Sequence, residues 1–278
     1  MTLDPRARTL TLSAADLPSL AGADGLAATF VKLDAGSSGE AASSVRTIAL
    51  PPTPKLTELQ LWRFPELREL SLDAPRLTIF QAYGVPLLER VSPLPRLRSL
   101  QASCSLAVFA GSLAAVREIH QIHVDEAARP ALGELEAVTH FVCVTPLERL
   151  DFFPALPRLK SLGVVGPNLR TLDGVETLGS ITNLTIRSGA LTDISAIAGL
   201  SKLKEVSFAG CSSLRDVGPL ASFGRLRQVN LEHTKVRPSD VPLSLVPARS
   251  PSGIHPQALR RKVEALAKQA RAASTSGG

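Results

Sequence analysis

Leu159-Lys-Ser-Leu162-Gly-Val164 has a spacing of aliphatic residues that occurs three more times in this chain and that predicts its fold. The later copies are Ile181-Thr-Asn-Leu184-Thr-Ile186, Leu203-Lys-Glu-Val206-Ser-Phe208 and Leu226-Arg-Gln-Val229-Asn-Leu231. Successive copies start 22, 22 and 23 residues apart. The apolar spacing of two at the end of each copy predicts a short strand that buries one face.

The segments between these strands carry a different period. They read Leu191-x-Asp193-Ile194-x-x-Ile197-x-x-Leu200 and Leu214-x-Asp216-Val217-x-x-Leu220-x-x-Phe223. An apolar spacing of three is typical of a 3₁₀-like turn. The sequence therefore predicts units of about 22 residues, each made of a strand and a short helical return.

This pattern resembles the leucine-rich-repeat family, and in particular its short 22-residue subclass, as in internalins and the leucine-rich regulatory subunit of protein phosphatase 1. The resemblance is strong over residues 138–236 and looser over 56–137. It implies an α/β solenoid with parallel strands on the concave face and short helical, 3₁₀ or irregular returns on the convex face. It also implies a binding role for the concave face.

The same family places an Asn or Cys along the stack of repeats, where its side chain hydrogen-bonds to the neighbouring repeat. Cys211 falls at this position, and Thr234 can substitute for it. Pro167 and Gly189 offer no side-chain hydrogen bond there, so we expect an incomplete polar ladder.

Upstream of residue 138 two registers compete, because leucine motifs begin roughly every half repeat. The favoured register starts its strands at Leu56, Leu77, Leu97, Ile119 and Val138. The rival register starts them at Val45, Leu67 and Leu88, and reaches a poor strand at Val91-Ser92-Pro93. We favour the first, which predicts about nine stacked repeats over residues 51–236.

A stack of repeats exposes apolar edges at its two ends, which must be capped. Residues 1–50 match the repeat poorly and are expected to form the N-terminal cap. After the repeats we expect a proline-rich connector over 237–256, an amphipathic helix over 257–273 and a disordered tail over 274–278.

Basic residues concentrate near the C-terminus. The chain has a net charge of +6, of which residues 237–278 contribute +5. The helix over 257–273 could cap the last repeat, or it could dock on nucleic acid or an anionic membrane. We favour the cap, because the apolar stripe is narrow and few aromatic residues are present to stack on bases.

Composition also bears on location. The N-terminal residues lack the apolar core of a signal peptide, and no run approaches the ~18 apolar residues of a membrane span. The three cysteines are widely spaced and odd in number, which favours a reducing compartment. We expect a cytoplasmic protein, and the alanine-, arginine- and proline-rich composition suggests a bacterial source.

The favoured register places the single tryptophan and the single tyrosine, Trp62 and Tyr83, on neighbouring strands. Gln60, Gln81 and Gln101 form a row beside them. Exposed aromatic residues are enriched at binding hot spots, so we predict a partner-binding surface here. The same outward columns continue through His123, Asp125 and Arg187. The alternative is that Trp62 or Tyr83 packs beneath the N-terminal cap.

Sequence features of catalysis are missing. No phosphate-binding loop, dinucleotide fingerprint, zinc-protease motif or nucleophile elbow occurs, so we assign no catalytic, cofactor or metal residues. His120 and His123 are expected on opposite faces of one strand. His123, Asp125 and His140 could approach one another, but as solvated surface rather than as a metal site.

These observations lead to one functional expectation and one alternative. We expect a non-enzymatic interaction module or scaffold that binds a protein on its concave face. The alternative is an electrostatic adaptor that uses the basic C-terminal helix.

Overall fold

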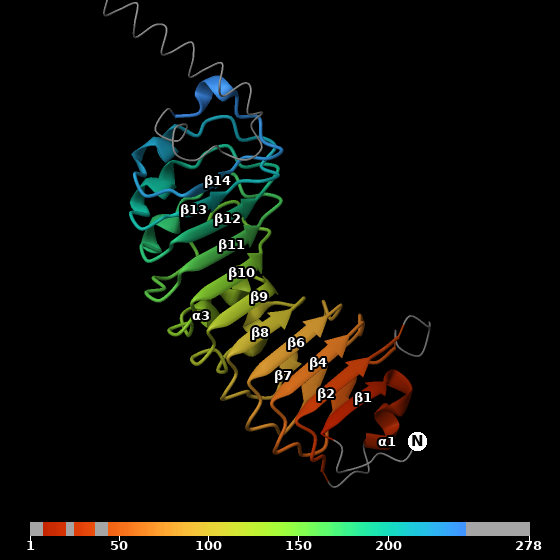
Figure 1. The fold of residues 1–278 in the computed structure, drawn as a ribbon. Coiled ribbons are helices and arrows are strands. Elements are labelled where there is room, and N and C mark those ends of the chain that lie inside the picture. Colours follow the sequence, from red (N-terminus) through yellow and green to blue (C-terminus); the bar gives the residue numbers. More distant parts are fainter. Residues whose placement is uncertain (1–7, 21–24, 37–43, 243–278) are drawn as a thin grey trace, which may run out of the picture. The chain divides into compact units, whose positions relative to one another are not determined.

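The computed structural model describes residues 8–20, 25–36 and 44–242. The chain falls into two compact units, residues 1–144 and 145–278 (Figure 1). Both units are α/β arrangements of parallel strands with few and short helices. None of the helices in the described ranges is long and apolar enough to cross a membrane.

The main sheet of the first unit holds seven strands in the described ranges, and each pairs in parallel with the next of them along the chain. In order these are β1 (Thr9–Ser13), β2 (Phe30–Asp34), β4 (Glu58–Trp62), β6 (Ile79–Tyr83), β8 (Ser99–Ala102), β9 (Glu118–His123) and β10 (His140–Val144). The favoured register is confirmed at Leu56, Leu77, Leu97 and Val138, since β4, β6, β8 and β10 follow them.

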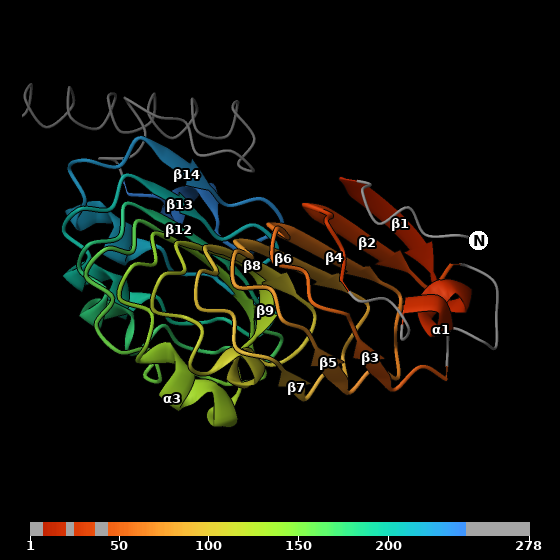
Figure 2. The same cartoon turned by 90° about the horizontal axis from the view of Figure 1, so that it is seen from below.

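The rival register also forms strands. β3 (Thr47–Ala49), β5 (Glu69–Ser71) and β7 (Arg90–Val91) make a second parallel sheet, which lies across the unit from the main sheet (Figure 2). The expectation of helical or irregular returns is therefore wrong for this stretch. β7 ends at Val91, directly before Ser92-Pro93, as the missing N–H of proline requires.

Proline turns explain the two sheets. In the first unit, five turns share the pattern X-Pro-x-Leu, with the leucine N–H bonded to the carbonyl of the first residue, and they span 53–56, 64–67, 74–77, 85–88 and 94–97. Two more turns of this kind, 156–159 and 166–169, lie in the second unit. Proline at the second position of a turn has the φ that the turn needs. The chain therefore reverses about every ten residues, and each half repeat supplies one strand.

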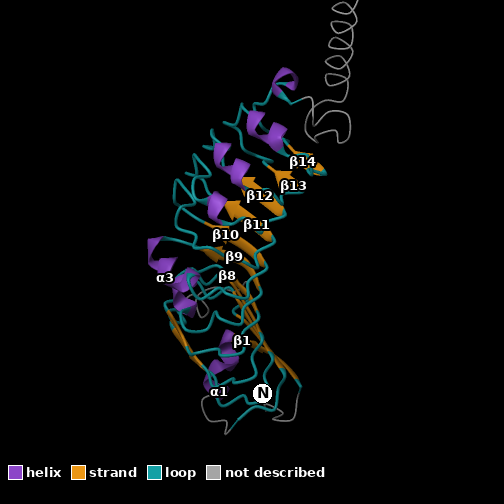
Figure 3. Cartoon of the chain, turned by 90° about the vertical axis from the view of Figure 1, so that its left-hand side faces the viewer, coloured by secondary structure: helices purple, strands orange, loops and turns teal. Residues whose placement is uncertain are grey.

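The second unit has 3₁₀ returns, as the period of three predicted. Its parallel strands are β11 (Ser161–Val165), β12 (Asn183–Arg187), β13 (Glu205–Ser207) and β14 (Gln228–Asn230). Its returns are the 3₁₀ helices η4 (Val175–Thr177), η5 (Ser195–Gly199) and η6 (Gly218–Ser222). These helices lie along one side of the strands (Figure 3).

The remaining helices in the described ranges are single turns. They are η1 (Ala14–Asp16), α1 (Leu17–Leu20), η2 (Leu106–Phe109), η3 (Glu126–Ala128), α3 (Arg129–Leu132) and η7 (Pro238–Asp240). Residues 1–50, which we expected to form an N-terminal cap, contribute β1 and β2 to the main sheet and β3 to the second sheet. The expected C-terminal helix and tail, and most of the connector, lie outside the described residues.

Polar side chains complete the backbone hydrogen bonding at the turns. In the first unit the hydroxyl oxygens of Ser92, Ser103 and Ser112 accept the N–H groups of Leu72, Val85 and Leu94 at 2.9–3.0 Å. In the second unit the Cys211 thiol donates to the Ile186 carbonyl at 3.4 Å. Buried Ser188 donates to the Leu169 carbonyl at 2.7 Å. Ser188 thus supplies a polar group one residue before Gly189, where none was expected.

Candidate functional site

Three neighbouring strands of the first unit present their outward side chains together. The register pairs Asp34 of β2 with Trp62 of β4, and Trp62 with Tyr83 of β6. Alternate residues of these strands are buried below the sheet, so the residues between them face outward. The predicted adjacency of Trp62 and Tyr83 is confirmed.

The two aromatic rings stack on each other. Their centroids are 4.2 Å apart and their planes are inclined by 25°. Both side chains are half-buried, unlike the fully buried phenylalanines of the core, such as Phe80. A stacked pair that keeps part of its surface in water offers a preformed apolar contact to a partner.

Charged residues of β2 flank the aromatic pair. The Lys32 ammonium lies over the Trp62 ring, 5.3 Å from its centroid. Because β2 and β6 pair with opposite edges of β4, Lys32 and Tyr83 approach Trp62 from opposite sides. β2 belongs to residues 1–50, expected as the N-terminal cap, and it contacts Trp62 as a neighbouring strand of the same sheet. Sequence reasoning missed Lys32, although the alternation Val31-Lys32-Leu33 marks a strand.

Asp34 holds two cations beside the pair. Its carboxylate is 2.6 Å from the Arg63 guanidinium and 3.7 Å from the Lys32 ammonium. Partial burial alone would raise the pKa of Asp34, but the Gly36 N–H and the Arg63 guanidinium outweigh it and lower that pKa. Asp34 thus remains ionised at neutral pH and fixes Lys32 near the ring.

The three predicted glutamines also align, since Gln60 pairs with Gln81 and Gln81 with Gln101. Gln60 donates to Glu58 at 2.8 Å and accepts the indole N–H of Trp62 at 3.3 Å. Gln101 donates to Gln121 at 3.1 Å. The Gln81 side chain has no hydrogen-bond partner among the described residues, so its donor and acceptor groups are free.

A bulge in β9 moves the histidines from their expected positions. Gln121 has a φ of 57° and interrupts the pairing, so that Ile119 pairs with Phe141 but Ile122 pairs with Cys143. Ile119, which we expected to start its repeat, pairs with Leu100, three residues after the repeat start at Leu97. The register of this repeat is therefore shifted by three residues from the expected one. His120 and His123 both lie on the outward face, and the expectation of opposite faces is wrong.

The other predicted residues are dispersed. His123 pairs with Val144, whereas His140 pairs with Glu118 at the opposite ends of the two strands. Asp125 accepts the Ala128 N–H at 3.1 Å and caps η3. In the parts of the chain that the structure describes, no group of three or more metal-ligating side chains converges.

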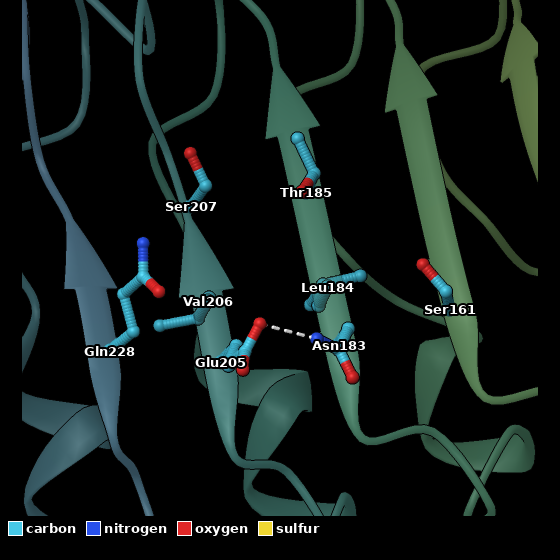
Figure 4. Close-up of a pocket in the computed structure, with 8 residues that line it drawn as sticks. All are labelled: Ser161, Asn183, Leu184, Thr185, Glu205, Val206, Ser207 and Gln228. Carbon is cyan, nitrogen blue, oxygen red and sulfur yellow. Dashed lines mark hydrogen bonds between the residues drawn. The ribbon is translucent and has the colours of Figure 1, made fainter.

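Arg187 belongs to the second unit, where it is exposed and pairs with Val165. The sheet of this unit carries a shallow pocket of about 180 Å³ between neighbouring strands. Figure 4 shows its polar lining, in which Asn183 donates a hydrogen bond to Glu205. Its small size and polar walls make it a poorer binding site than the aromatic pair.

The described cysteines are not activated for catalysis. Cys104, Cys143 and Cys211 are free thiols and all are buried. Burial raises the pKa of each thiol, and that of Cys104 reaches about 12. A thiol in this state is a poor nucleophile at neutral pH.

Comparisons with protein-family models and with curated protein sequences find no match for this chain.

Proposed function

We propose that this chain is a leucine-rich-repeat solenoid that binds another protein through the outward face of β2, β4 and β6. The repeated L-x-x-L-x-L segments and the parallel pairing of successive strands support the solenoid. The stacked pair of Trp62 and Tyr83 carries the binding proposal. Tryptophan and tyrosine dominate binding energy at interfaces because they bury a large area with few rotatable bonds.

The groups around the pair fit a protein partner. Gln81 offers a free amide donor and acceptor beside the rings, which suits the backbone of a partner chain. Lys32, Asp34 and Arg63 form a charged border, which resembles the polar rim around the apolar centre of an interface.

The test is affinity capture from native lysate with wild type and with a Trp62→Ala/Tyr83→Ala double variant, with captured proteins identified by mass spectrometry. Leu87→Ala is the matched control, because Leu87 is a large apolar side chain that is 38% exposed on a turn of the same unit. The folding of each variant is checked by thermal unfolding.

A partner retained by wild type and Leu87→Ala, and lost by the double variant, would support the proposal. With that partner purified, we expect the double variant to bind at least roughly thirtyfold more weakly, as for hot-spot aromatics. Trp62 is the only tryptophan, so its fluorescence reports contact directly. Equal affinity of the folded double variant and wild type would overturn the proposal.

A further inference from the structure

A row of cations follows the edge of the first unit's main sheet at which its strands begin. The row consists of Lys55, Arg76, Arg96, Arg98 and Arg117, all of them exposed. They stand directly before or after the first apolar residue of the segments that lead into β4, β6, β8 and β9. Because the strands are parallel, these positions repeat along one edge at intervals of about 5 Å.

Backbone hydrogen bonds define this edge. The N–H of Thr78 donates to the Thr57 carbonyl, that of Arg98 to the Thr78 carbonyl, and that of Arg117 to the Arg98 carbonyl, at 2.8–2.9 Å. The guanidinium groups of Arg98 and Arg117 are thus attached to adjacent, rigidly spaced backbone positions.

The cations of this row have no carboxylate partner among the described residues. Other cations of the unit have them, namely Lys32, Arg63, Arg68, Arg90 and Arg129. Over the described ranges no ion pair involves Lys55, Arg76, Arg96, Arg98 or Arg117, and Glu118, which follows Arg117, forms none with them. Cations gathered along one edge repel each other, and an anion bound among them relieves that repulsion.

The row borders an open pocket of about 510 Å³. Three arginines line it, Arg76, Arg96 and Arg98, and Pro95 and Ala115 add apolar surface. Thr57 and Thr78 also line it, but their hydroxyls donate to the carbonyls of Thr29 and Thr57 at 3.0 and 3.1 Å. The arginines are therefore the principal hydrogen-bond donors left for a ligand.

We propose that this pocket binds an extended acidic segment of a partner protein, whose carboxylates pair with Arg76, Arg96 and Arg98. The planar guanidinium matches a carboxylate in two parallel hydrogen bonds. Alternate side chains of an extended peptide lie about 7 Å apart on one side, within reach of long arginines on neighbouring strands.

An acidic peptide is favoured over nucleic acid because the pocket contains no aromatic ring on which a base could stack. The surface is also distinct from the proposed aromatic site. The cations stand where the strands begin, whereas Trp62 and Tyr83 are the last residues of β4 and β6.

In the second unit, cations also flank the first apolar residue of the repeats that start at Leu159, Leu203 and Leu226, whereas Ser180 and Thr182 flank Ile181. Exposed cations there are Arg158, Lys160, Lys202, Lys204, Arg225 and Arg227. None of them forms an ion pair with a described residue. Because such cations occur in both units, their position follows the sequence repeat and is not confined to one local cluster.

The test is fluorescence anisotropy of the full chain with a labelled peptide of about a dozen residues that alternates Glu and Ala. The test variant combines Arg76→Gln, Arg96→Gln and Arg98→Gln. Its matched control combines Arg68→Gln, Arg90→Gln and Arg129→Gln, which removes the same charge from exposed, paired arginines. We expect roughly tenfold weaker binding by the test variant and less than about twofold by the control.

Three results would overturn the proposal. They are no binding to wild type above that of a matching Gln-Ala peptide, an equal loss in both variants, and tighter binding of an oligothymidine by the same arginines. Trp62→Ala/Tyr83→Ala is expected to leave peptide binding unchanged, which keeps this test separate from that of the aromatic site.

Discussion

Gly174 is a position where the fold permits no side chain. Its φ is 98°, and a Cβ there would lie 2.3 Å from the Asp151 Cα. Such a contact is with backbone, so rotation of a side chain cannot relieve it.

We expect Gly174→Ala to lower the free energy of unfolding by at least about 1–3 kcal/mol, measured by urea denaturation followed by circular dichroism. Gly179→Ala is the control, because a Cβ there meets nothing within 4 Å. A change of about 0.5 kcal/mol or less is expected for it. If the two variants were equally stable, steric exclusion at Gly174 would be refuted.

Burial also limits the reactivity of the three cysteine thiols. Burial raises the pKa of Cys104 from an ordinary 9.0 to about 12. At neutral pH we therefore expect Ellman's reagent to label none of the three cysteines in the native chain and all of them in denaturant.

The same shift predicts a pH dependence of stability. The unfolded chain releases the Cys104 proton near pH 9, whereas the folded chain holds it until about 12. The stabilisation is complete below pH 9 and is lost as pH rises toward 12. Cys104→Ser, which lacks this titration, should show a weaker alkaline decline in urea midpoint; an identical decline would argue against the shift.

At the scale of elements, the returns differ between the units for a local reason. In the first unit, an uninterrupted series of five proline turns reverses the chain at every half repeat, between which β3, β5 and β7 form, whereas the described part of the second unit has such turns only at 156–159 and 166–169. In the second, Asp193 and Asp216 accept the N–H groups of Ser195 and Gly218 at 2.7 Å, where η5 and η6 begin. A side-chain oxygen at this place satisfies a backbone donor that the helix leaves unpaired.

We expect Asp193→Ala to lower the free energy of unfolding by about 1 kcal/mol, because the Ser195 N–H loses its acceptor. Asp193→Asn keeps an acceptor oxygen and should recover most of that loss. Thermal unfolding of wild type and the two variants distinguishes the outcomes, and an equal destabilisation by Ala and Asn would point to the charge of Asp193 instead of its hydrogen bond to the Ser195 N–H.

At the scale of the whole molecule, stability should depend on how many neighbours a strand has. Among the described strands β1 pairs on one side only, whereas β4 pairs on both sides. Leu12 of β1 and Leu61 of β4 are both buried beneath the sheet.

We expect Leu61→Ala to cost about 2–5 kcal/mol and Leu12→Ala at least about 1 kcal/mol less, since a terminal strand contacts a single neighbour. Trp62 fluorescence during urea unfolding reports on this unit. Hydrogen exchange should likewise be faster in β1 than in β4. Equal costs for the two substitutions would mean that β1 is packed as an interior strand.

The distribution of charge is also a property of the folded units. Outside residues 237–278 the chain is nearly neutral, with 24 basic and 23 acidic residues. In the first unit, folding pairs some of these cations with carboxylates and gathers others along one edge. Composition alone gave no reason to expect a basic surface on the repeats.

The repeating strands, the 3₁₀ returns of the second unit and the adjacency of Trp62 and Tyr83 could be predicted from the amino-acid sequence. These features follow from apolar periodicity, which is a local property: a spacing of two or three residues selects which side chains are buried. The prolines of the first unit can be read from the sequence as well. That they mark turns between two sets of strands becomes clear only once both half repeats are seen to form strands.

Three features depend on the folded structure: the placement of Lys32 over Trp62, the face on which His120 and His123 lie, and which cations form ion pairs with carboxylates. Lys32 pairs with Gln60, 28 residues later in the chain, and this register between β2 and β4 brings Lys32 to Trp62. One bulge residue, Gln121, shifts every later side chain of β9, because strand side chains alternate with a period of two. Such outcomes depend on contacts between distant segments, which no local pattern specifies.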